Sequence, residues 1–438
     1  MSGFGAANRA LVAGCLALTL TLAPTLTGCS AASKPDPAGS TPDVGGADRT
    51  PEAGRAESTP ATGTLVTTTV TGTDHRIQAP PGWSVQLWAE LPGARLLAWT
   101  PDGRLLVSRP GAGDVVALTP GPPGTKPRQT TLVGGLDQPH GLAFQNNTLY
   151  VAESDQVDRF TYRAGAVSGE RVVIAGLPDA KSPELGGAYA HALKSVAIGR
   201  DGTIFVSVGS TGNVSANDRE ARPQRATILQ APPGGGRPTV FARGVRNGTG
   251  LAIAPDGSVW TAVNNRDNIA DPSDGQVKQS YVNDHPLEPL ARLTPGRDLG
   301  WPYCNPDLDR RFVRDYQLNR DGAKLDCAKL APIEQGLGAH SAPLGLSFAT
   351  LAAPFGQGAL VGVHGSWNRT PPRAPEVSFF AWRNNALGPQ QTLLGGFQDA
   401  RGNRWGRPVM AVQGPDQALY VSDDLAGAIY RVQATATS

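Results

Sequence analysis

The feature that most constrains this chain is an internal repeat of six units. Each unit begins with a small residue between two apolar ones, continues with a turn, and then has a strand with period-two alternation. Three of the turns contain Asp-Gly, which favours a tight hairpin because Gly adopts a positive φ without steric cost. The triplets that open the units are Leu97-Ala98-Trp99, Leu142-Ala143-Phe144, Val196-Ala197-Ile198, Leu251-Ala252-Ile253, Leu346-Ser347-Phe348 and Met410-Ala411-Val412.

Six such units cannot be separate domains, because a single four-stranded sheet leaves both of its faces bare. A unit of about 45 residues suits one propeller blade, and radial stacking of blades buries those faces. We therefore expect an all-β fold, a six-bladed β-propeller of four-stranded antiparallel sheets, with an open solenoid of blades as the alternative. The segment WSVQLWAEL from Trp83 is expected to complete the last blade and close the ring, and the long spacing between Leu251 and Leu346 implies an insertion.

The composition agrees with many short strands and excludes one class of partner. The chain has 438 residues and is punctuated by 54 Gly and 38 Pro. Only 17% of the residues are charged, the formal net charge is +2, and no run of Lys and Arg occurs. We therefore expect no nucleic-acid partner.

The N-terminal segment has the features of an export signal. Arg9 is followed by an apolar run over residues 10–22, which is too short to span a bilayer comfortably. Leu26-Thr27-Gly28-Cys29 resembles the lipobox of bacterial lipoproteins, in which the Cys is lipidated and becomes the first residue after cleavage; an ordinary signal peptide is the alternative. We expect a signal peptide over residues 1–28 and an exported protein of the cell envelope, anchored to a membrane by lipid at Cys29.

The segment after the lipobox differs in composition from the rest of the chain. Residues 29–75 are rich in Pro, Ala, Gly, Ser and Thr, so we expect a disordered, flexible tether there and the propeller over residues 76–438. Beyond Cys15 and Cys29, two cysteines remain, Cys304 and Cys327, in an oxidising setting. We expect them to form one disulfide; a metal site is the weaker alternative, because two thiols are an incomplete ligand set.

Polar residues recur just before the triplets, which marks one end of the blades. Because binding sites form where polar groups converge in a concave surface, these residues are candidates for a site at the central opening. We expect His140 to make structural hydrogen bonds, and His191 and Arg246 to be functional. The polar positions are His140, His191, Arg246, Asn247, His340 and Arg407.

Several motifs in a fixed order resemble the glucose/sorbosone dehydrogenase family. His191 before VAIGRDGTIFVSVGS is similar to the catalytic-histidine segment of that family, and the HGSWNR motif and the closing 407–424 stretch look most like its sorbosone dehydrogenase branch. The resemblance covers roughly residues 80–433. The other motifs are Arg246-Asn247 before GLAIAPDG, the loop Asn264-Asn265-Arg266-Asp267, and Gly296-Arg297-Asp298-Leu299-Gly300-Trp301-Pro302.

The resemblance implies an enzyme that oxidises a sugar hydroxyl or aldehyde of the aldose or sorbosone type. It implies pyrroloquinoline quinone and calcium as cofactors and a separate electron acceptor as partner. His191 is the implied catalytic base, because an imidazole that titrates near neutrality suits removal of the hydroxyl proton. The carboxylates of the quinone need cations and hydrogen-bond donors, and calcium prefers oxygen ligands such as backbone carbonyls. The implied cofactor residues are Arg246, Asn247, His364, Arg369 and Arg407, and the implied calcium ligands are the carbonyls of Asn265 and Arg266.

The chain departs from the family pattern within the site. Family members often have Arg-x-Arg in the closing segment, where this chain has Arg407 and then Val409. The acidic residue before the catalytic His is Ala190, and the Gly-Pro of the calcium loop is Asn265-Arg266. A non-catalytic propeller that binds carbohydrate or protein at the cell envelope is therefore the alternative function. A calcium-dependent lactonase would need acidic metal ligands, for which the candidates are Glu153, Asp423 and Asp424.

Overall fold

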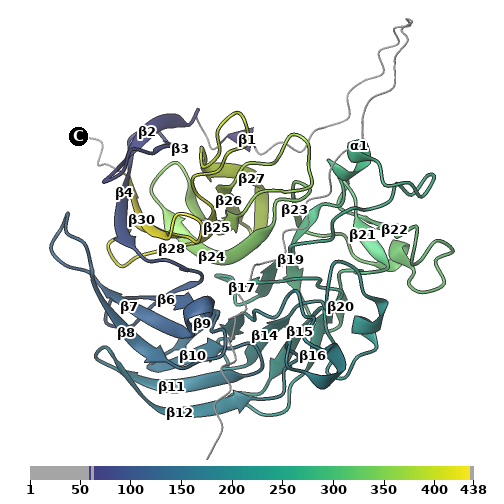
Figure 1. The fold of residues 1–438 in the computed structure, drawn as a ribbon, viewed down its shortest axis with the longest axis horizontal. Coiled ribbons are helices and arrows are strands. Elements are labelled where there is room, and N and C mark those ends of the chain that lie inside the picture. The colour runs from purple at the N-terminus through teal and green to yellow at the C-terminus, as the bar shows by residue number, and fades with distance from the viewer. Residues whose placement is uncertain (1–58, 61–63, 435–438) are drawn as a thin grey trace, which may run out of the picture. The chain divides into compact units, whose positions relative to one another are not determined.

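The computed structural model describes residues 59–60 and 64–434, and these form a six-bladed β-propeller (Figure 1). The expected all-β fold class is confirmed. The predicted signal peptide and the predicted lipidation site Cys29 lie outside the described residues. Among the described helices, the one α-helix is α1 (Gln279–Val282), and none is long and apolar enough to cross a membrane. The short 3-10 helices are η1 (Pro110–Ala112), η2 (Pro183–Leu185), η3 (Ala216–Arg219) and η4 (Cys327–Lys329).

Each of the first three blades is a sheet whose core strands follow one another in the chain. The first blade consists of β5 (Leu97–Trp99), β6 (Leu105–Arg109), β7 (Asp114–Thr119) and β8 (Arg128–Gly134). The second consists of β9 (Gly141–Gln145), β10 (Thr148–Ala152), β11 (Val157–Arg163) and β12 (Ala166–Ile174). The third consists of β13 (Val196–Ile198), β14 (Ile204–Val208), β15 (Thr227–Ala231) and β16 (Thr239–Arg243), extended by β20 (Arg297–Asp298).

The other three blades repeat this order, and the fifth and sixth also take up the N-terminal strands. The fourth consists of β17 (Gly250–Ile253), β18 (Val259–Ala262), β19 (Glu288–Leu293) and β23 (Gln335–Leu337). The fifth consists of β24 (Pro343–Leu351), β25 (Gly356–Val363), β26 (Glu376–Arg383) and β27 (Ala386–Leu394), with β1 (Thr59–Pro60) at its edge. The sixth consists of β28 (Pro408–Gln413), β29 (Leu419–Asp423), β30 (Ala428–Ala434) and β4 (Trp83–Glu90), followed by β2 (Val66–Thr71) and β3 (Arg76–Ala79).

The ring of blades is closed by a strand from the N-terminal side of the repeats. The strands β5, β9, β13, β17, β24 and β28 contact one another in this cyclic order, and β28 contacts β5. In Figure 1, β17 and β24 lie near the centre, whereas β12 and β16 lie at the periphery. β4 pairs antiparallel with β30, with Val85 opposite Val432. The predicted closure by the segment from Trp83 is therefore confirmed, and the open solenoid is excluded.

The hydrophobic core contains one large cluster for every pair of neighbouring blades. In the cluster between the fourth and fifth blades, for example, Trp260 and Leu290 pack with Leu346 and Phe380, all of them buried. Corresponding clusters join the other five pairs of neighbouring blades. Burial of each Leu or Phe side chain contributes about 1.5–3 kcal/mol to the free energy of unfolding. Packing of the apolar sheet faces between neighbouring blades therefore stabilises the ring.

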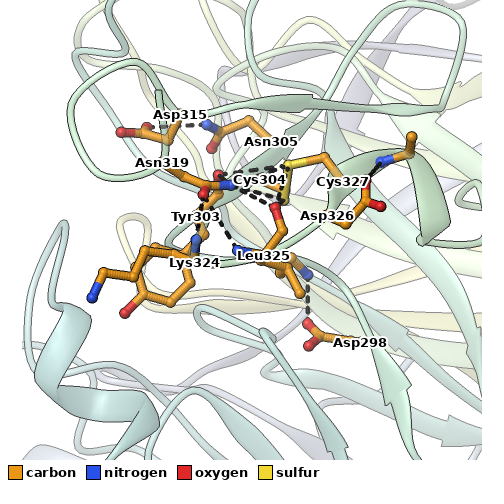
Figure 2. Close-up of a disulfide and its surroundings, with 12 residues drawn as sticks. Asp298, Tyr303, Cys304, Asn305, Asp315, Asn319, Lys324, Leu325, Asp326 and Cys327 are labelled. Atoms are coloured by element: carbon orange, nitrogen blue, oxygen red, sulfur yellow. Dashed lines mark hydrogen bonds between the residues drawn. A yellow bond between two sulfur atoms is a disulfide. The ribbon is translucent and has the colours of Figure 1, made fainter. Parts of the chain in front are cut away.

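The long spacing in the repeat is an insertion between β19 and β23. It contains β20 and the hairpin of β21 (Cys304–Pro306) and β22 (Phe312–Arg314). Cys304 and Cys327 form the predicted disulfide, with their Cα atoms 5.7 Å apart, which excludes the metal alternative. Figure 2 shows Asn319 beside this disulfide, and its Nδ2 donates to the carbonyl oxygens of Tyr303 (3.2 Å) and Leu325 (2.7 Å). The disulfide and this amide together fix the base of the insertion.

The boundary that we expected between tether and propeller is wrong by several residues. Part of the expected tether forms β2, which pairs with β3 and, in parallel, with β4 of the sixth blade. Val70 of β2 is fully buried in the cluster between the fifth and sixth blades. The six residues of β2 are two Val and four Thr, and the strand still buries one apolar side chain, so strand propensity outweighs the polar composition of the segment.

Candidate active site at the mouth of the propeller

The connections that lead into the inner strands lie at one end of the ring, because every blade repeats the same strand order. We call this end the mouth. His191 precedes β13, Arg246 and Asn247 precede β17, and Arg407 precedes β28, so these predicted site residues all lie at the mouth. The loops that join the second and third strands of the blades reach the same end, and they bring Asn264, Asn265, Arg266 and His364 there.

Arg95 is a mouth residue that was not predicted. Arg95 precedes Leu97 by two residues, just as His140 precedes Leu142, so the repeat places a basic residue in front of all six inner strands. Aligning the first unit with the second would have found Arg95, because the spacing is the same.

The imidazole of His191 is held in one tautomer by the loop after β14. Its Nδ1 lies 3.0 Å from the carbonyl oxygen of Ser210 and 2.9 Å from Ser210 Oγ. The Ser210 hydroxyl itself donates to the carbonyl oxygen of Gly212 (2.7 Å), and a carbonyl only accepts. Nδ1 therefore carries the proton and donates to Ser210, which leaves the lone pair on Nε2 as the basic atom.

The surroundings of His191 keep it neutral. Burial, and then the positive charge of Arg246, lower the pKa of His191 to about 4. Its side chain is only partly buried, so a molecule at the mouth has access to it. A neutral imidazole with a defined basic nitrogen can accept a proton, but its pKa of about 4 lies below the near-neutral value expected from the sequence, because the side chain is buried beside Arg246.

Arg246 is clamped by the neighbouring loops. Its Nε donates to the carbonyl oxygen of Asn213 (3.1 Å), one guanidinium nitrogen to Asn213 Oδ1 (3.1 Å), and the other to the carbonyl oxygen of Asn264 (3.2 Å). Burial lowers the pKa of Arg246 to about 10, and Asp267 opposes that shift. Arg246 therefore stays charged at neutral pH. Asn213 also accepts from the backbone N–H of Asp267 (2.8 Å), so it joins the third and fourth blades; its role was not predicted.

Asn247 and His191 both lie close to Gly209. A Cβ added to Gly209 would lie 2.5 Å from His191 Cβ and 3.2 Å from Asn247 Oδ1. The glycine is therefore required by the close approach of the two site residues. Asn247 is 8% exposed, and its carbonyl oxygen accepts from the backbone N–H of Asn264 (2.9 Å).

The predicted calcium loop is buried and held by its side chains. Asn265 Nδ2 donates to the carbonyl oxygen of Leu287 (3.2 Å), and Asn265 Oδ1 accepts from the backbone N–H of Arg266 (2.9 Å). The guanidinium of Arg266 forms a buried ion pair with Asp315 of the insertion. Within residues 64–434, no hydrogen bond is made to the backbone carbonyl oxygens of Asn265 and Arg266, so both remain available to a cation.

A second group of mouth residues gathers around Asp424 of the sixth blade. Asp424 Oδ1 accepts from Arg407 Nε (2.9 Å), and Oδ2 accepts from a terminal nitrogen of Arg95 (2.6 Å). His364 Nε2 lies 3.4 Å from Asp424 Oδ1. Burial, and then the charges of Arg95, Arg407 and Arg404, hold the pKa of His364 well below its usual range. Two guanidiniums and a neutral imidazole thus share one carboxylate.

The remaining residues of the HGSWNR motif lie at the edge of this group. Arg369 lies 3.9 Å from Asp284, so it belongs to the rim and not to the Asp424 group. Trp367 is 73% exposed. The backbone carbonyl of Asn368 accepts from Gln279 Nε2 (2.9 Å), which ties this loop to α1.

The other polar mouth residues are occupied by structural contacts. His140 is fully buried, and its Nδ1 bonds to the carbonyl oxygen of Lys194 (3.2 Å) in the next blade, as expected of a structural histidine. His340 bonds to the carbonyl oxygen of Val282 (2.8 Å) and lies 3.2 Å from Asp267. Of the acidic residues considered for a lactonase, Asp423 accepts from the backbone N–H of Arg407 (2.8 Å).

Among the described residues, one group of carboxylates is close enough to share a metal ion, and it is not the predicted calcium loop. Ligand atoms of Asp137, Asp155 and Asp179 lie within 4.8 Å of one another. The ammonium of Lys181 donates to Asp137, and the charges of Asp179 and Asp155 act on the buried ammonium of Lys194. These lysines offset much of the negative charge of the group.

A hollow elsewhere on the propeller is not part of this site. It has a volume of about 520 Å³ and lies between the sixth and first blades, where Trp88, Trp99 and Tyr420 line it together with residues 120–125. None of the predicted site residues lines it.

The fold and the polar mouth define a six-bladed β-propeller of the class to which sugar dehydrogenases belong. A family model described as TrAA12-like matches residues 77–435. The chain therefore belongs to the TrAA12-like family, and the predicted relationship to quinone-dependent sugar dehydrogenases is confirmed.

Individual relatives agree with this placement. The chain is 25% identical over 297 residues to the pyrroloquinoline quinone-dependent pyranose dehydrogenase of Coprinopsis cinerea, a match that covers 56% of this chain and 40% of that protein. A Trichoderma reesei carbohydrate-active enzyme of family AA12 has a similar structure, with a TM-score of 0.70 at 19% identity, over 82% of this chain and 97% of that one. The holo quinone domain of the Coprinopsis cinerea enzyme gives a TM-score of 0.68 at 20% identity, with the same coverage.

Proposed function

We propose that this protein is a sugar dehydrogenase that oxidises a hydroxyl or aldehyde group of an aldose-type or sorbosone-type sugar with pyrroloquinoline quinone and calcium. One observation carries the proposal: Ser210 fixes the Nδ1 proton of His191, so that Nε2 is a base at the mouth. The relationship to a quinone-dependent pyranose dehydrogenase supports the substrate class.

The donors at the mouth fit the proposed cofactors. The quinone carries carboxylates, for which Arg246 and Arg407 provide guanidinium groups and Asn247 an amide; His364 and Arg369 lie nearby as further candidates. The backbone carbonyl oxygens of Asn265 and Arg266, which accept no hydrogen bond within residues 64–434, are the type of ligand that calcium prefers.

In the proposed reaction, His191, Arg246 and Ser210 each have a separate role. His191 Nε2 accepts the proton of the sugar hydroxyl as the hydride leaves the same carbon, which becomes a carbonyl. Burial, and then the charge of Arg246, keep the imidazole neutral beforehand, and the same charge favours negative charge on the reacting oxygen. Ser210 stabilises the imidazolium that forms, because it accepts from Nδ1. Pyrroloquinoline quinone, when bound, supplies the hydride acceptor, and its electrons pass on to a separate carrier.

Dye reduction by the purified propeller tests this function. With quinone and calcium added, the wild type is expected to reduce an artificial dye at the expense of at least one aldose in a broad panel. His191→Gln should lower the rate about 100-fold or more, because the general base is lost. His75→Gln is the matched control, since His75 is exposed, lies in the β2–β3 connection at the outer edge of the sixth blade, and stacks on Trp405. If the wild type reduces no dye with any sugar, the proposal is wrong.

We also propose that the protein is anchored in the cell envelope by lipid at Cys29. The lipobox-like Leu26-Thr27-Gly28-Cys29 supports this location. Intact-mass measurement of the mature protein should give the mass of a diacylglyceryl-modified chain that begins at Cys29, and Cys29→Ser should abolish the modification. A mature wild-type protein that lacks lipid would contradict the proposal.

A further inference from the structure

We infer that Arg95 is a second cationic ligand of the quinone, and that Arg95 and Arg407 form a carboxylate-binding pair held together by Asp424. The inference rests on the proposed function, because it assigns a residue to the same cofactor. Neither the motifs of the sequence nor the comparisons with known proteins assign a role to Arg95.

Asp424 holds the guanidiniums of Arg95 and Arg407 close together and accepts only one hydrogen bond from each. Asp424 binds Arg407 Nε through one oxygen (2.9 Å) and a terminal nitrogen of Arg95 through the other (2.6 Å). In the part of the chain that the structure describes, these are the only side-chain hydrogen bonds that the two arginines make, although a guanidinium carries five N–H donors. The remaining donors suit a carboxylate ligand, which an arginine binds with two parallel hydrogen bonds.

The charge balance of this corner of the mouth favours an anion. The positive charges of Arg95, Arg404 and Arg407 all act on His364, which stays neutral. Arg404 donates to the backbone carbonyl oxygens of Ser366 and Arg373 and to Gln398 Oε1, which are uncharged. Asp424 is therefore the one carboxylate that pairs with these three guanidiniums among the described residues, and net positive charge remains.

The position of Arg95 explains how the site works without a second arginine in the closing segment. Val409 occupies the place where family members often have that arginine, and it is fully buried against Leu96 and Leu344. A guanidinium could not occupy this apolar cluster without the cost of burying an unpaired charge. Arg95, the neighbour of Leu96, brings a guanidinium to Arg407 from the first blade instead.

Titration of the purified propeller with pyrroloquinoline quinone in the presence of calcium tests the inference, with quenching of tryptophan emission as the readout. Arg95→Gln is expected to raise the Kd about 10- to 100-fold, the effect of losing a charge-assisted hydrogen bond, and Arg407→Gln should act similarly. Arg95→Lys keeps the charge but not the two-pronged geometry, so a smaller increase is expected. If Arg95→Gln does not fold, the Kd of Arg95→Lys for the quinone tests the inference.

Arg109→Gln is the matched control, because Arg109 also lies in the first blade and also pairs with an aspartate, Asp114. Its Kd should equal that of the wild type. If both Arg95 variants bind the quinone as the wild type does while Arg407→Gln binds it weakly, Arg95 is only a structural partner of Asp424 and the inference is overturned. Absence of binding to the wild type is a different outcome, which overturns the proposed function and the inference together.

Discussion

At the scale of single residues, the site depends on a few contacts that set the chemistry of each group. Ser210 decides which nitrogen of His191 is basic, and burial, followed by the charge of Arg246, lowers the pKa of the imidazole. Asp424 brings Arg407 and Arg95 together. Each of these groups would behave differently on an isolated peptide, because its protonation or its orientation is set by a residue from another strand or blade.

Gly209 gives a sharp test of the packing around the base. In Gly209→Ala the new Cβ would lie 2.5 Å from His191 Cβ, so the imidazole or its loop must shift. The kcat/KM for the sugar should fall at least about tenfold, because the base is misplaced. Gly212→Ala, in the same loop, has nothing within 4 Å of its new Cβ and should leave kcat/KM unchanged. Equal values for the two variants would contradict this account.

The buried side chain of His140 makes the free energy of unfolding depend on pH. Burial, and then the charge of Arg95, lower the pKa of His140 to about 3, whereas the unfolded chain binds that proton near pH 6.5. Between these values the unfolded state holds the extra proton, so stability falls as pH falls and levels off above about 6.5. In His140→Gln the slope of the unfolding free energy over this range should be smaller by about 1.4 kcal/mol per pH unit. Urea unfolding at several pH values measures it, and equal slopes would refute the prediction.

At the scale of elements, the sixth blade differs from the others because it is completed from the N-terminal side. It joins β28, β29 and β30 to β4, and then adds β2 and β3, so it has six strands. The pairing of the strands sets the positions of the loops at the mouth. Arg407 can reach Asp424, for example, because β28 and β29 pair with Pro408 opposite Asp423.

Two valines of the same strand test whether β2 belongs to the propeller. Val70 is fully buried and Val66 is 42% exposed, both in β2. Val70→Ala should lower the free energy of unfolding by about 2 kcal/mol, because it removes buried methyl groups and leaves a cavity. Val66→Ala should change it by less than about 0.5 kcal/mol. Chemical denaturation measures both, and equal effects would mean that β2 does not contribute to the core.

The elements could be predicted where their signals are local. The triplet, the turn and the alternating strand of each unit follow one another within a short segment, so the six blades and their order were correctly predicted. β2 was not, because its Thr-rich sequence resembles the polar segment before it and only pairing with β4 gives it a face to bury. The disulfide was predicted by elimination, but the part of Asn319 in fixing it depends on the turn between the two cysteines.

At the scale of the whole molecule, closing the ring converts a linear repeat into one site. Residues that occupy the same place in each unit gather at one end, which is why the repeat predicted where His191, Arg246 and Arg407 lie. The pairings among them could not be predicted. Asn213 and Arg246 are 33 residues apart and meet through the folding of the third blade, whereas Asp424 and Arg95 are 329 apart and are brought together by closure of the ring.

Reduction of the bound quinone by a sugar, followed by its absorbance without oxygen or dye, shows whether His191 is the base of this site. We expect His191→Gln to bind the quinone with the Kd of the wild type, because the imidazole is not one of its charged ligands. Reduction of that bound quinone should be about 100-fold slower or more, because Nε2 no longer takes the proton. If the variant is reduced as fast as the wild type, His191 is not the base and the assignment of this mouth as the catalytic site is contradicted.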